Sequence, residues 1–544
     1  MIVNPIIPGF YPDPSICRVG EDYYLVNSSF SMFPGIPVFH GTDLAHWERI
    51  GYVLDRPSQL HVTADSLVAG LMAPTIRYHE GTFCVIVFNA SAKGNLLVTA
   101  KDPRGPWSEP TWLTDVPGID ATLFFDDDGQ AYVAGTDRFP QPDGSQGPQV
   151  IWGAAFDLAE RRLTGPRTVL WGGALNGCAS PEAPHLYRKD GGYVLVIAEG
   201  GTEHFHAVTV ARSRDVLGPY EGFAGNPVLT HRHLGKDYPI GNPGHADLVE
   251  TQNGDWYAVL LASRLIDGYH KNLGRETWIC PVTWEDGWPV FSPGTGKVEW
   301  TYPDTGLPVF EPRSVPVRDD FDGDRLDPEW RFIGTPYRPF HRVADGRLEL
   351  RLLPRALAPE LVSTRFHFDE EPDASVPSLA VVARIQEHPS FRAATRMDFK
   401  ARAENEAAGL VVMQASNHQF RLERSLSEGR QVLRLVRATC ELHGLPFLPG
   451  FSSRTHEEIL ATTEVPEGPI ALEIQARGQD FGFFYGSDES GLRPLLEGVD
   501  GRAINPEVVG GMVGTLLGLL ATSNGRESGN SAAFEWFELE RVLL

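Results

Sequence analysis

Three acidic side chains occupy matched places in similar segments of the N-terminal half, and together they could perform acid–base chemistry. Asp13 lies between prolines at positions 12 and 14, Glu182 follows a proline at 181, and Asp120 stands in a segment between them. Proline fixes its own φ and biases the preceding residue towards an extended conformation, so these neighbours would hold the carboxylates rigidly. Clustered carboxylates raise one another's pKa, so one can stay protonated as an acid while another stays ionised as a base. Glycoside hydrolysis uses such a pair.

An internal repeat supplies the elements that would bring these side chains together. Each of five segments reads as an apolar stretch, a turn containing glycine and a second apolar stretch, which is the pattern of a β-hairpin. The segments begin at Asp13, Ala73, Asp120, Ala183 and His245, about 47 to 63 residues apart, which leaves room for about four short strands each. The repeat predicts a five-bladed β-propeller over residues 1–310, with a β-sandwich as the alternative. In a propeller the repeat starts meet at the mouth of one channel.

A cluster of prolines, followed by a change of pattern, predicts a second domain. Four prolines lie between residues 303 and 316, so we expect a proline-rich linker at 311–317. Beyond the linker, apolar and polar residues alternate, for example at 347–352 and 471–476. Such alternation is typical of strands with one buried face. We therefore predict an all-β chain in which residues 318–544 form a two-layer antiparallel sandwich.

Composition and charge exclude several classes of function. The 544 residues carry a formal net charge of −24, so no basic face is available for nucleic acid. No run of about 18 apolar residues occurs, and the first residues form neither a basic nor an apolar signal region, so we expect a cytoplasmic protein without a membrane partner. The five cysteines stand far apart without a CxxC pair, which argues against a disulfide framework and a structural zinc site. The oligomeric state stays open, a homo-oligomer included.

Seven short motifs, in this order along the chain, resemble glycoside hydrolase family 43, in its branch of β-xylosidases and α-L-arabinofuranosidases with a C-terminal sandwich. They are Gly-Phe-Tyr-Pro-Asp-Pro-Ser at 9–15, Ala-Pro-Thr at 73–75, Gly-Ile-Asp-Ala-Thr at 118–122, Pro-Glu-Ala-Pro-His at 181–185, Ala-Glu-Gly-Gly-Thr at 198–202, Gly-His-Ala-Asp at 244–247 and Leu-Gly-Arg-Glu-Thr at 273–277. The resemblance covers essentially the whole chain. It implies that the sandwich is of the jelly-roll, lectin-like kind, packs on the propeller and contributes to the rim of the site.

The resemblance also implies a mechanism and its residues. The expected reaction is exo-acting, inverting release of a terminal pentose from short oligosaccharides, without a required cofactor. Asp13 would be the general base, Glu182 the general acid, and Asp120 the residue that orients the acid and adjusts its pKa. The residues expected to bind the sugar are Arg275, Phe30, Met72, Ala73, Thr202, His245 and Leu516.

The sequence leaves two alternative roles open for His245. A lone histidine is often a buried residue with satisfied hydrogen bonds. In relatives the channel histidine supports a calcium ion or a water molecule, so Ca²⁺ in the propeller channel is a second reading, although the sequence shows no dedicated cage of oxygen ligands. The pairs at 204 and 206 and at 231 and 233 lack a third ligand, and we expect these histidines in loops or at the channel mouth.

Aliphatic residues replace aromatic ones that many relatives carry near the sugar. Met72 precedes the motif at 73–75, and the glycine-rich segment 510–518 contains Met512 and Leu516. Sugar faces pack on aromatic rings, so these replacements change the expected shape of the pocket.

Three functions compete on the sequence. The first is a glycosidase for terminal β-D-xylose, with α-L-arabinofuranose or both sugars as the alternative. The second is a retaining fructan- or sucrose-cleaving enzyme, whose Asn-Asp-Pro-Asn-Gly type of motif is absent. The third is a non-catalytic carbohydrate-binding propeller, which would not need three carboxylates at matched positions.

Overall fold

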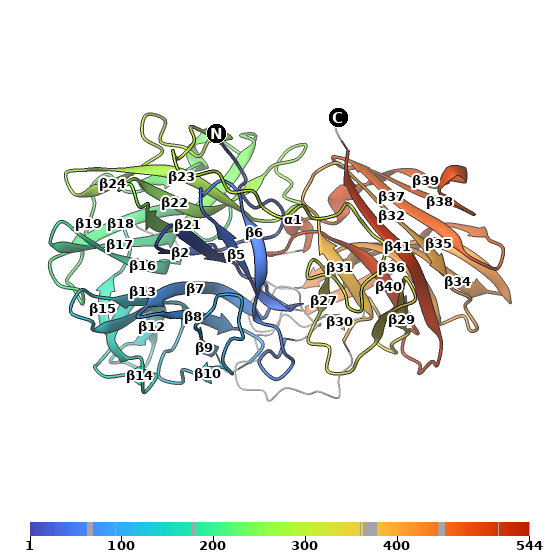
Figure 1. The fold of residues 1–544 in the computed structure, drawn as a ribbon, viewed down its shortest axis with the longest axis horizontal. Helices are drawn as coiled ribbons and strands as arrows, with labels where there is room; N and C mark the ends of the chain where they lie inside the picture. The colour runs from blue at the N-terminus through green and yellow to red at the C-terminus, as the bar shows by residue number, and fades with distance from the viewer. Residues whose placement is uncertain are drawn as a thin grey trace.

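The computed structural model describes residues 1–62, 69–92, 94–175, 180–358, 361–362, 378–443, 452–509 and 511–542. The chain forms two β-rich bodies side by side (Figure 1), with the N-terminal strands in blue to green and the C-terminal strands in orange to red. Within these residues, no helix is long and apolar enough to cross a membrane. Helical turns are confined to η1 (Arg232–Leu234), η2 (Glu489–Gly491), η3 (Gly501–Ala503) and α1 (Pro506–Val509) in the described ranges.

Five separate antiparallel sheets make up the N-terminal body, one for each sequence repeat. The first two sheets consist of β2 (Ser15–Val19), β3 (Asp22–Val26), β5 (Gly35–Gly41) and β6 (Glu48–Leu54), and of β7 (Leu71–His79), β8 (Thr82–Asn89), β9 (Gly94–Ala100) and β10 (Thr111–Trp112). The third consists of β11 (Ile119–Phe125), β12 (Ala131–Pro140), β13 (Gln146–Asp157) and β14 (Arg162–Leu163), with β15 (Thr168–Trp171) also paired with β13. The fourth consists of β16 (Glu182–Lys189), β17 (Gly192–Glu199), β18 (Ala207–Ser213) and β19 (Glu221–Gly222), with β20 (Leu229–Thr230) also paired with β18, and the fifth of β21 (Ile240–Glu250), β22 (Trp256–Arg264), β23 (Glu276–Glu285) and β24 (Trp288–Phe291). The predicted five-bladed propeller is confirmed.

The starts of all five repeats share one unusual backbone conformation. The φ angles are 54° at Asp13, 48° at Ala73, 55° at Asp120, 53° at Ala183 and 50° at His245. In the last four of these blades, the pairing register of the first strand shifts around this position, as in a β-bulge. A non-glycine residue in the left-handed region is strained, and such strain concentrates at functional sites. The bulge re-aims the side chains at the end of each innermost strand.

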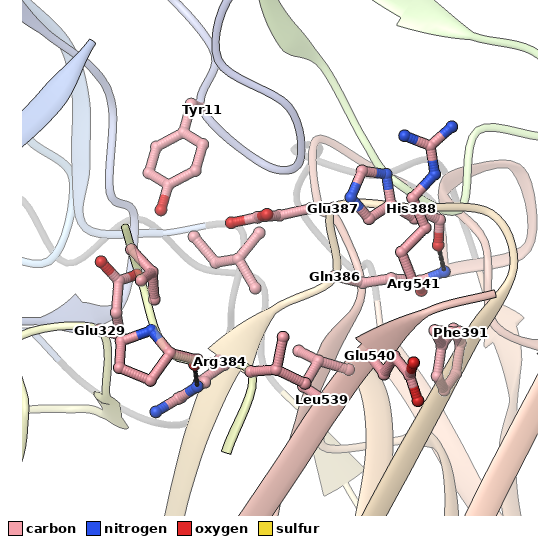
Figure 2. A pocket seen from close by; sticks show the side chains of 14 residues that line it. Tyr11, Glu329, Arg384, Gln386, Glu387, His388, Phe391, Leu539, Glu540 and Arg541 are labelled. Carbon is pink, nitrogen blue, oxygen red and sulfur yellow. Dashed lines mark hydrogen bonds between the residues drawn. The ribbon is translucent and has the colours of Figure 1, made fainter. Parts of the chain in front are cut away.

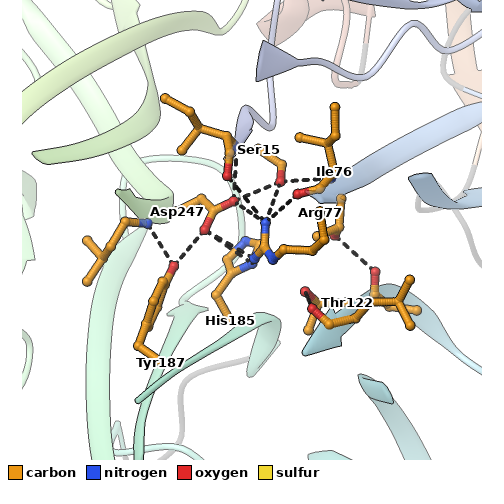
Figure 3. A network of polar contacts seen from close by, with 12 residues as sticks. Ser15, Ile76, Arg77, Thr122, His185, Tyr187 and Asp247 are labelled. Atoms are coloured by element: carbon orange, nitrogen blue, oxygen red, sulfur yellow. Dashed lines mark hydrogen bonds and ion pairs between the residues drawn. The ribbon is translucent and has the colours of Figure 1, made fainter. Parts of the chain in front are cut away.

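A polar network on the propeller axis ties four blades together below these bulges (Figure 3). The buried Asp247 carboxylate accepts hydrogen bonds from Ser15 Oγ at 2.7 Å, Arg77 Nη1 at 2.9 Å and Tyr187 Oη at 2.6 Å. Arg77 Nη2 also donates to His185 Nδ1 at 2.9 Å. Since these residues come from β2, β7, β16 and β21, the network fixes the spacing of the strands that carry the repeat starts.

The C-terminal body is a two-layer sandwich, as predicted. One sheet has the order β28 (His341–Ala344), β29 (Arg347–Arg351), β41 (Ser531–Arg541), β32 (Phe391–Asp398), β37 (Ile470–Arg477), β38 (Asp480–Gly486) and β39 (Arg493–Asp500), with β26 (Arg318–Asp319) also on β41. The other has the order β30 (Leu361–Val362), β36 (Ser452–Glu464), β35 (Arg430–His443), β34 (His418–Ser427), β33 (Ala407–Ala415), β40 (Leu516–Thr522), β31 (Val381–Ile385), β27 (Arg331–Ile333) and β4 (Met32–Phe33). Apolar side chains such as Phe420, Leu472 and Phe534 fill the core between them.

The two bodies share a sheet edge, which the sequence did not indicate. β4 comes from the first propeller repeat, yet it pairs with β27 of the sandwich. Residues 303–317 form no strand or helix, and the N-terminal β1 (Ile2–Val3) pairs with β25 (Thr301–Tyr302) just before them. The exact domain limits of 1–310, 311–317 and 318–544 remain a prediction.

Candidate active site

The three carboxylates predicted to act together line one cavity of about 410 Å³ at the mouth of the propeller. The rest of the wall is largely apolar and comes from all five blades and from the sandwich. The lining residues are Asp13, Phe30, Met72, Ala73, Phe88, Ile119, Asp120, Gln149, Ser180, Glu182, Gly201, Thr202, His206, His245, Leu261, Arg275 and Met512. A cavity of this size holds a small ligand and buries most of its surface.

Asp13 is 5% exposed and is surrounded by hydrogen-bond donors. Its Oδ1 accepts from Arg275 Nη1 at 2.9 Å and lies 3.3 Å from His245 Nδ1, while its Oδ2 accepts from Ser28 Oγ at 2.6 Å. Burial alone would raise the pKa of Asp13, but the Arg275 charge and the hydrogen bonds from His245 and Ser28 bring it well below its ordinary value. Asp13 is therefore ionised at neutral pH.

The pKa values of Glu182 and Asp120 are raised, in contrast to that of Asp13. Burial raises the pKa of Glu182 well above its ordinary value, and the nearby charges of Asp120 and Asp13 raise it further. Burial also raises the pKa of Asp120 to about 6, although the backbone N–H of Ala183 donates to its Oδ2 at 3.1 Å. The surroundings of Glu182 therefore favour its protonated form, beside an Asp13 whose ionised form is favoured. The cavity thus holds one proton donor and one proton acceptor.

Arg275 lines the cavity and carries donor groups without a partner in the described residues. Its Nη1 donates both to Asp13 and to Thr202 Oγ1, the latter at 3.1 Å. Its Nε and Nη2 are buried and have no hydrogen-bond partner among the residues that the structure describes. Buried unpaired donors are costly, so these two groups are suited to hydroxyl oxygens of a ligand.

His245 lies against the Asp13 carboxylate. Burial alone would lower the pKa of His245, but the hydrogen bond to Asp13 and the charges of Asp13 and Asp120 raise this pKa overall. In the described part of the chain, no group of three or more His, Cys, Asp or Glu side chains could hold a metal ion. A Ca²⁺ ion in the propeller channel therefore stays a prediction.

Several lining residues were not identified from the sequence. Phe88, Gln149 and Leu261 stand on strands without a quoted motif, whereas Ile119 lies next to Asp120 within the motif at 118–122. His206, which we expected in a loop or at the channel mouth, is 2% exposed, lines the cavity and lies with Nδ1 2.9 Å from the Asn242 carbonyl oxygen.

The His206 ring packs directly against the backbone of Gly244. A Cβ atom on Gly244 would lie 2.3 Å from its ring, so only glycine lets the imidazole approach the β21 backbone. In the sequence, the glycine of the motif at 244–247 was the residue that could have indicated such a close approach.

The expectation for Leu516 differs from what the structure shows. Phe30, Met72, Ala73 and Thr202 line the cavity as expected, whereas Leu516 does not belong to its wall. Leu516 is 2% exposed within β40, where it pairs with Met413 and Ile385. The side chain that the sandwich contributes to the cavity is Met512, which precedes the strand. Gly510, at the start of the same segment, lies outside the described residues.

A second cavity of about 230 Å³ lies at the seam between the two bodies, and none of the predicted site residues lines it. Figure 2 shows Tyr11 of the propeller facing Arg384, Phe391 and Leu539 on the sandwich strands. Its walls combine three glutamates with two arginines, so its charges are largely balanced within the protein.

Comparisons with known proteins agree with the geometry. The family model described as glycosyl hydrolases family 43 matches residues 2–289, and that of the β-xylosidase C-terminal concanavalin A-like domain matches residues 318–540. A xylosidase/arabinosidase of Butyrivibrio fibrisolvens is 41% identical over 99% of both chains. A non-reducing end α-L-arabinofuranosidase of Bacteroides ovatus is 35% identical over 98% of this chain and 94% of its own. The solved xylan β-1,4-xylosidase of Bacillus halodurans is 29% identical, covers 99% of this chain and 100% of its own, and superposes with a TM-score of 0.85.

Proposed function

This chain belongs to glycosyl hydrolases family 43, and from that membership we propose that it is an exo-acting, inverting glycosidase that releases a terminal pentose, with β-D-xylose as the first candidate. The observation that carries the proposal is that two carboxyl groups line one cavity in surroundings that favour opposite protonation states. A cavity of about 410 Å³ is large enough to take one terminal sugar unit.

The proposed reaction assigns one proton transfer to each carboxyl group. Glu182 donates its proton to the oxygen of the leaving sugar as the bond from that oxygen to the anomeric carbon breaks. Asp13 accepts a proton from a water molecule whose oxygen forms the new bond on the opposite face. Asp120 keeps Glu182 protonated through its own negative charge. The product therefore has the inverted anomeric configuration.

Arg275 links the base to the sugar in this proposal. It stabilises the ionised form of Asp13, and its unpaired Nε and Nη2 would donate to pentose hydroxyls. The apolar side chains of Phe30, Met72 and Met512 would pack on the faces of the sugar. No step requires a cofactor.

A second candidate substrate is α-L-arabinofuranose, alone or together with xylose. The relatives favour it, since one is named for both sugars and another for arabinofuranose. We also propose that the substrates are short oligosaccharides inside the cell.

A screen of para-nitrophenyl pentosides tests the proposal, with NMR following the anomer of the first sugar released. We expect turnover of the β-D-xyloside, of the α-L-arabinofuranoside, or of both, and an inverted product. A retained product would assign Asp13 as a nucleophile instead. Absence of turnover on all pentosides, with sugar binding intact, would favour the carbohydrate-binding alternative.

A further inference from the structure

We propose that Asn272 is a positioning residue, through which the β-sandwich holds Arg275 against Asp13. The inference rests on the proposed function, in which Asp13 is the base. Asn272 belongs to the propeller segment between β22 and β23, three residues before Arg275 and outside the lining of the cavity.

The side chain of Asn272 is bonded entirely to the sandwich. It is 3% exposed, and its Nδ2 donates to the carbonyl oxygens of Ile504 at 2.9 Å and Gly501 at 3.2 Å. Its Oδ1 accepts from Gln479 Nε2 at 2.7 Å. The amide nitrogen and the amide oxygen of Asn272 are therefore both hydrogen-bonded to the sandwich, across the interface between the two bodies.

The backbone carbonyl of Asn272 is held by the sandwich as well. It accepts from Thr515 Oγ1 at 2.7 Å, from the Thr515 N–H at 2.9 Å and from Gln414 Nε2 at 2.8 Å. Buried hydrogen bonds of this number and length leave the residue one position. Thr515 also lies three residues after Met512, so one sandwich segment both lines the cavity and fixes Asn272.

The chain between Asn272 and Arg275 has little freedom to absorb a displacement. Gly274 adopts φ +75°, and a Cβ there would lie 2.8 Å from the Val513 carbonyl oxygen and 2.7 Å from the Phe10 ring. Across the contact, a Cβ on Gly514 would lie 2.8 Å from the Leu273 carbonyl oxygen. The two backbones therefore touch, and movement of Asn272 is transmitted to Arg275.

A neighbouring ion pair strengthens the same connection. Lys271 is 2% exposed, and its Nζ lies 3.0 Å from Glu507 of α1 and also forms an ion pair with Glu203. Glu203 follows Thr202, the second partner of Arg275. Through Lys271 and Glu203 the sandwich is thus also connected to the segment that carries Thr202.

The test is the pH profile of kcat/KM for Asn272→Ala, on a pentoside that the wild-type enzyme hydrolyses. Displacement of Arg275 by a fraction of an ångström should lower kcat/KM by roughly 10–100-fold. Because Arg275 holds the pKa of Asp13 down, its displacement raises that pKa, and the acidic limb of the profile should move to higher pH. Thr515→Val, which removes one hydroxyl donor to Asn272, should move it in the same direction by less.

Tyr52→Phe is the matched control, because the Tyr52 hydroxyl also bonds across the interface, to the Pro328 carbonyl oxygen at 2.5 Å, but away from the cavity. It should leave the acidic limb unchanged. If Asn272→Ala folds and keeps the wild-type acidic limb, or if Tyr52→Phe moves the limb equally, Asn272 only stabilises the interface and the inference is wrong. Should Asn272→Ala not fold, Thr515→Val decides by the same criterion.

A crystal structure of the variant separates this inference from the proposed function. The distance from Arg275 Nη1 to Asp13 Oδ1, 2.9 Å in the wild-type chain, should increase beyond hydrogen-bond reach. This readout does not depend on hydrolysis. If the wild-type protein cleaves no pentoside, the proposed function fails, while an unchanged distance in the variant would overturn the positioning role itself.

Discussion

Asp13 and Glu182 share one cavity but experience different surroundings. Arg275, His245 and Ser28 donate to Asp13 and favour its ionised form. At Glu182, burial and the charges of Asp120 and Asp13 outweigh the opposing effects of Arg275 and Gln149, so the protonated form is favoured. A negative charge in such a site is stable only where donors compensate for the loss of water, and this difference sets the proposed roles.

Glu182→Ala should separate substrates by their leaving groups. A proton from Glu182 matters when the departing oxygen is a sugar alkoxide and matters little when it is a stable phenolate. We expect losses of about 10²–10⁴-fold on oligosaccharides and much smaller losses on activated aryl pentosides. Asp13→Ala is the comparison, since water activation is needed for both substrates. Equal losses across leaving groups in folded Glu182→Ala would show that another residue is the acid.

Asp120→Asn should move the alkaline limb of the pH profile. Asp120 is ionised above its pKa of about 6 and then favours the protonated form of Glu182. Removal of that charge lowers the pKa of Glu182, so the limb that reports loss of the acid's proton should shift to lower pH. The measurement is kcat/KM against pH for both proteins. A shift to higher pH would contradict the assigned interaction.

At the scale of elements, five innermost strands bring these residues to one place. Each repeat starts with a left-handed residue within or just before its innermost strand, and the network around Asp247 and Arg77 joins four of these strands. Although burial raises the pKa of Asp247, Arg77 and the hydrogen bond from Tyr187 bring it well below its ordinary value. The stabilisation from this carboxylate is therefore present at neutral pH and is lost as the pH falls below about 4.

Asp247→Asn should destabilise the propeller strongly. It leaves the Arg77 guanidinium buried without its counterion, which costs about 3–5 kcal/mol. Thermal denaturation at neutral pH measures the loss. Glu349→Gln, which breaks the exposed pair with Arg342, should cost less than about 1 kcal/mol. Similar changes in the two variants would mean that Arg77 is compensated by its other partners.

At the scale of the whole molecule, the sandwich completes the site. Met512 forms part of the cavity wall, Asn272 is bonded to the sandwich, and β4 pairs with β27. These contacts join residues hundreds of positions apart. The two bodies therefore depend on each other for a finished cavity.

A propeller ending at residue 317 should be insoluble or inactive. The truncation removes Met512, the partners of Asn272 and the apolar surface that covers the first blade. Expression, solubility and pentoside hydrolysis are the measurements. Full activity in a soluble truncated protein would show that the sandwich is not part of the site.

Cytoplasmic location and assembly into oligomers also remain predictions. Cell fractionation tests the first, and light scattering tests the second.

The sequence by itself determined the repeat, the all-β class and the three carboxylates, because hairpin patterns and turn residues are local. Asp13 and Asp120 stand at repeat starts, and Glu182 immediately precedes the start at Ala183. The sequence also marked Ala73, Thr202, His245 and Arg275 through short motifs that resemble one family, and Phe30 and Met72 through the same resemblance. Only the tertiary structure decided that Met512 rather than Leu516 reaches the cavity, that His206 packs on Gly244, and that Asn272 carries the contact from the sandwich. These contacts join residues far apart in the chain, and which side chains meet across two packed bodies depends on three-dimensional complementarity that no local pattern encodes.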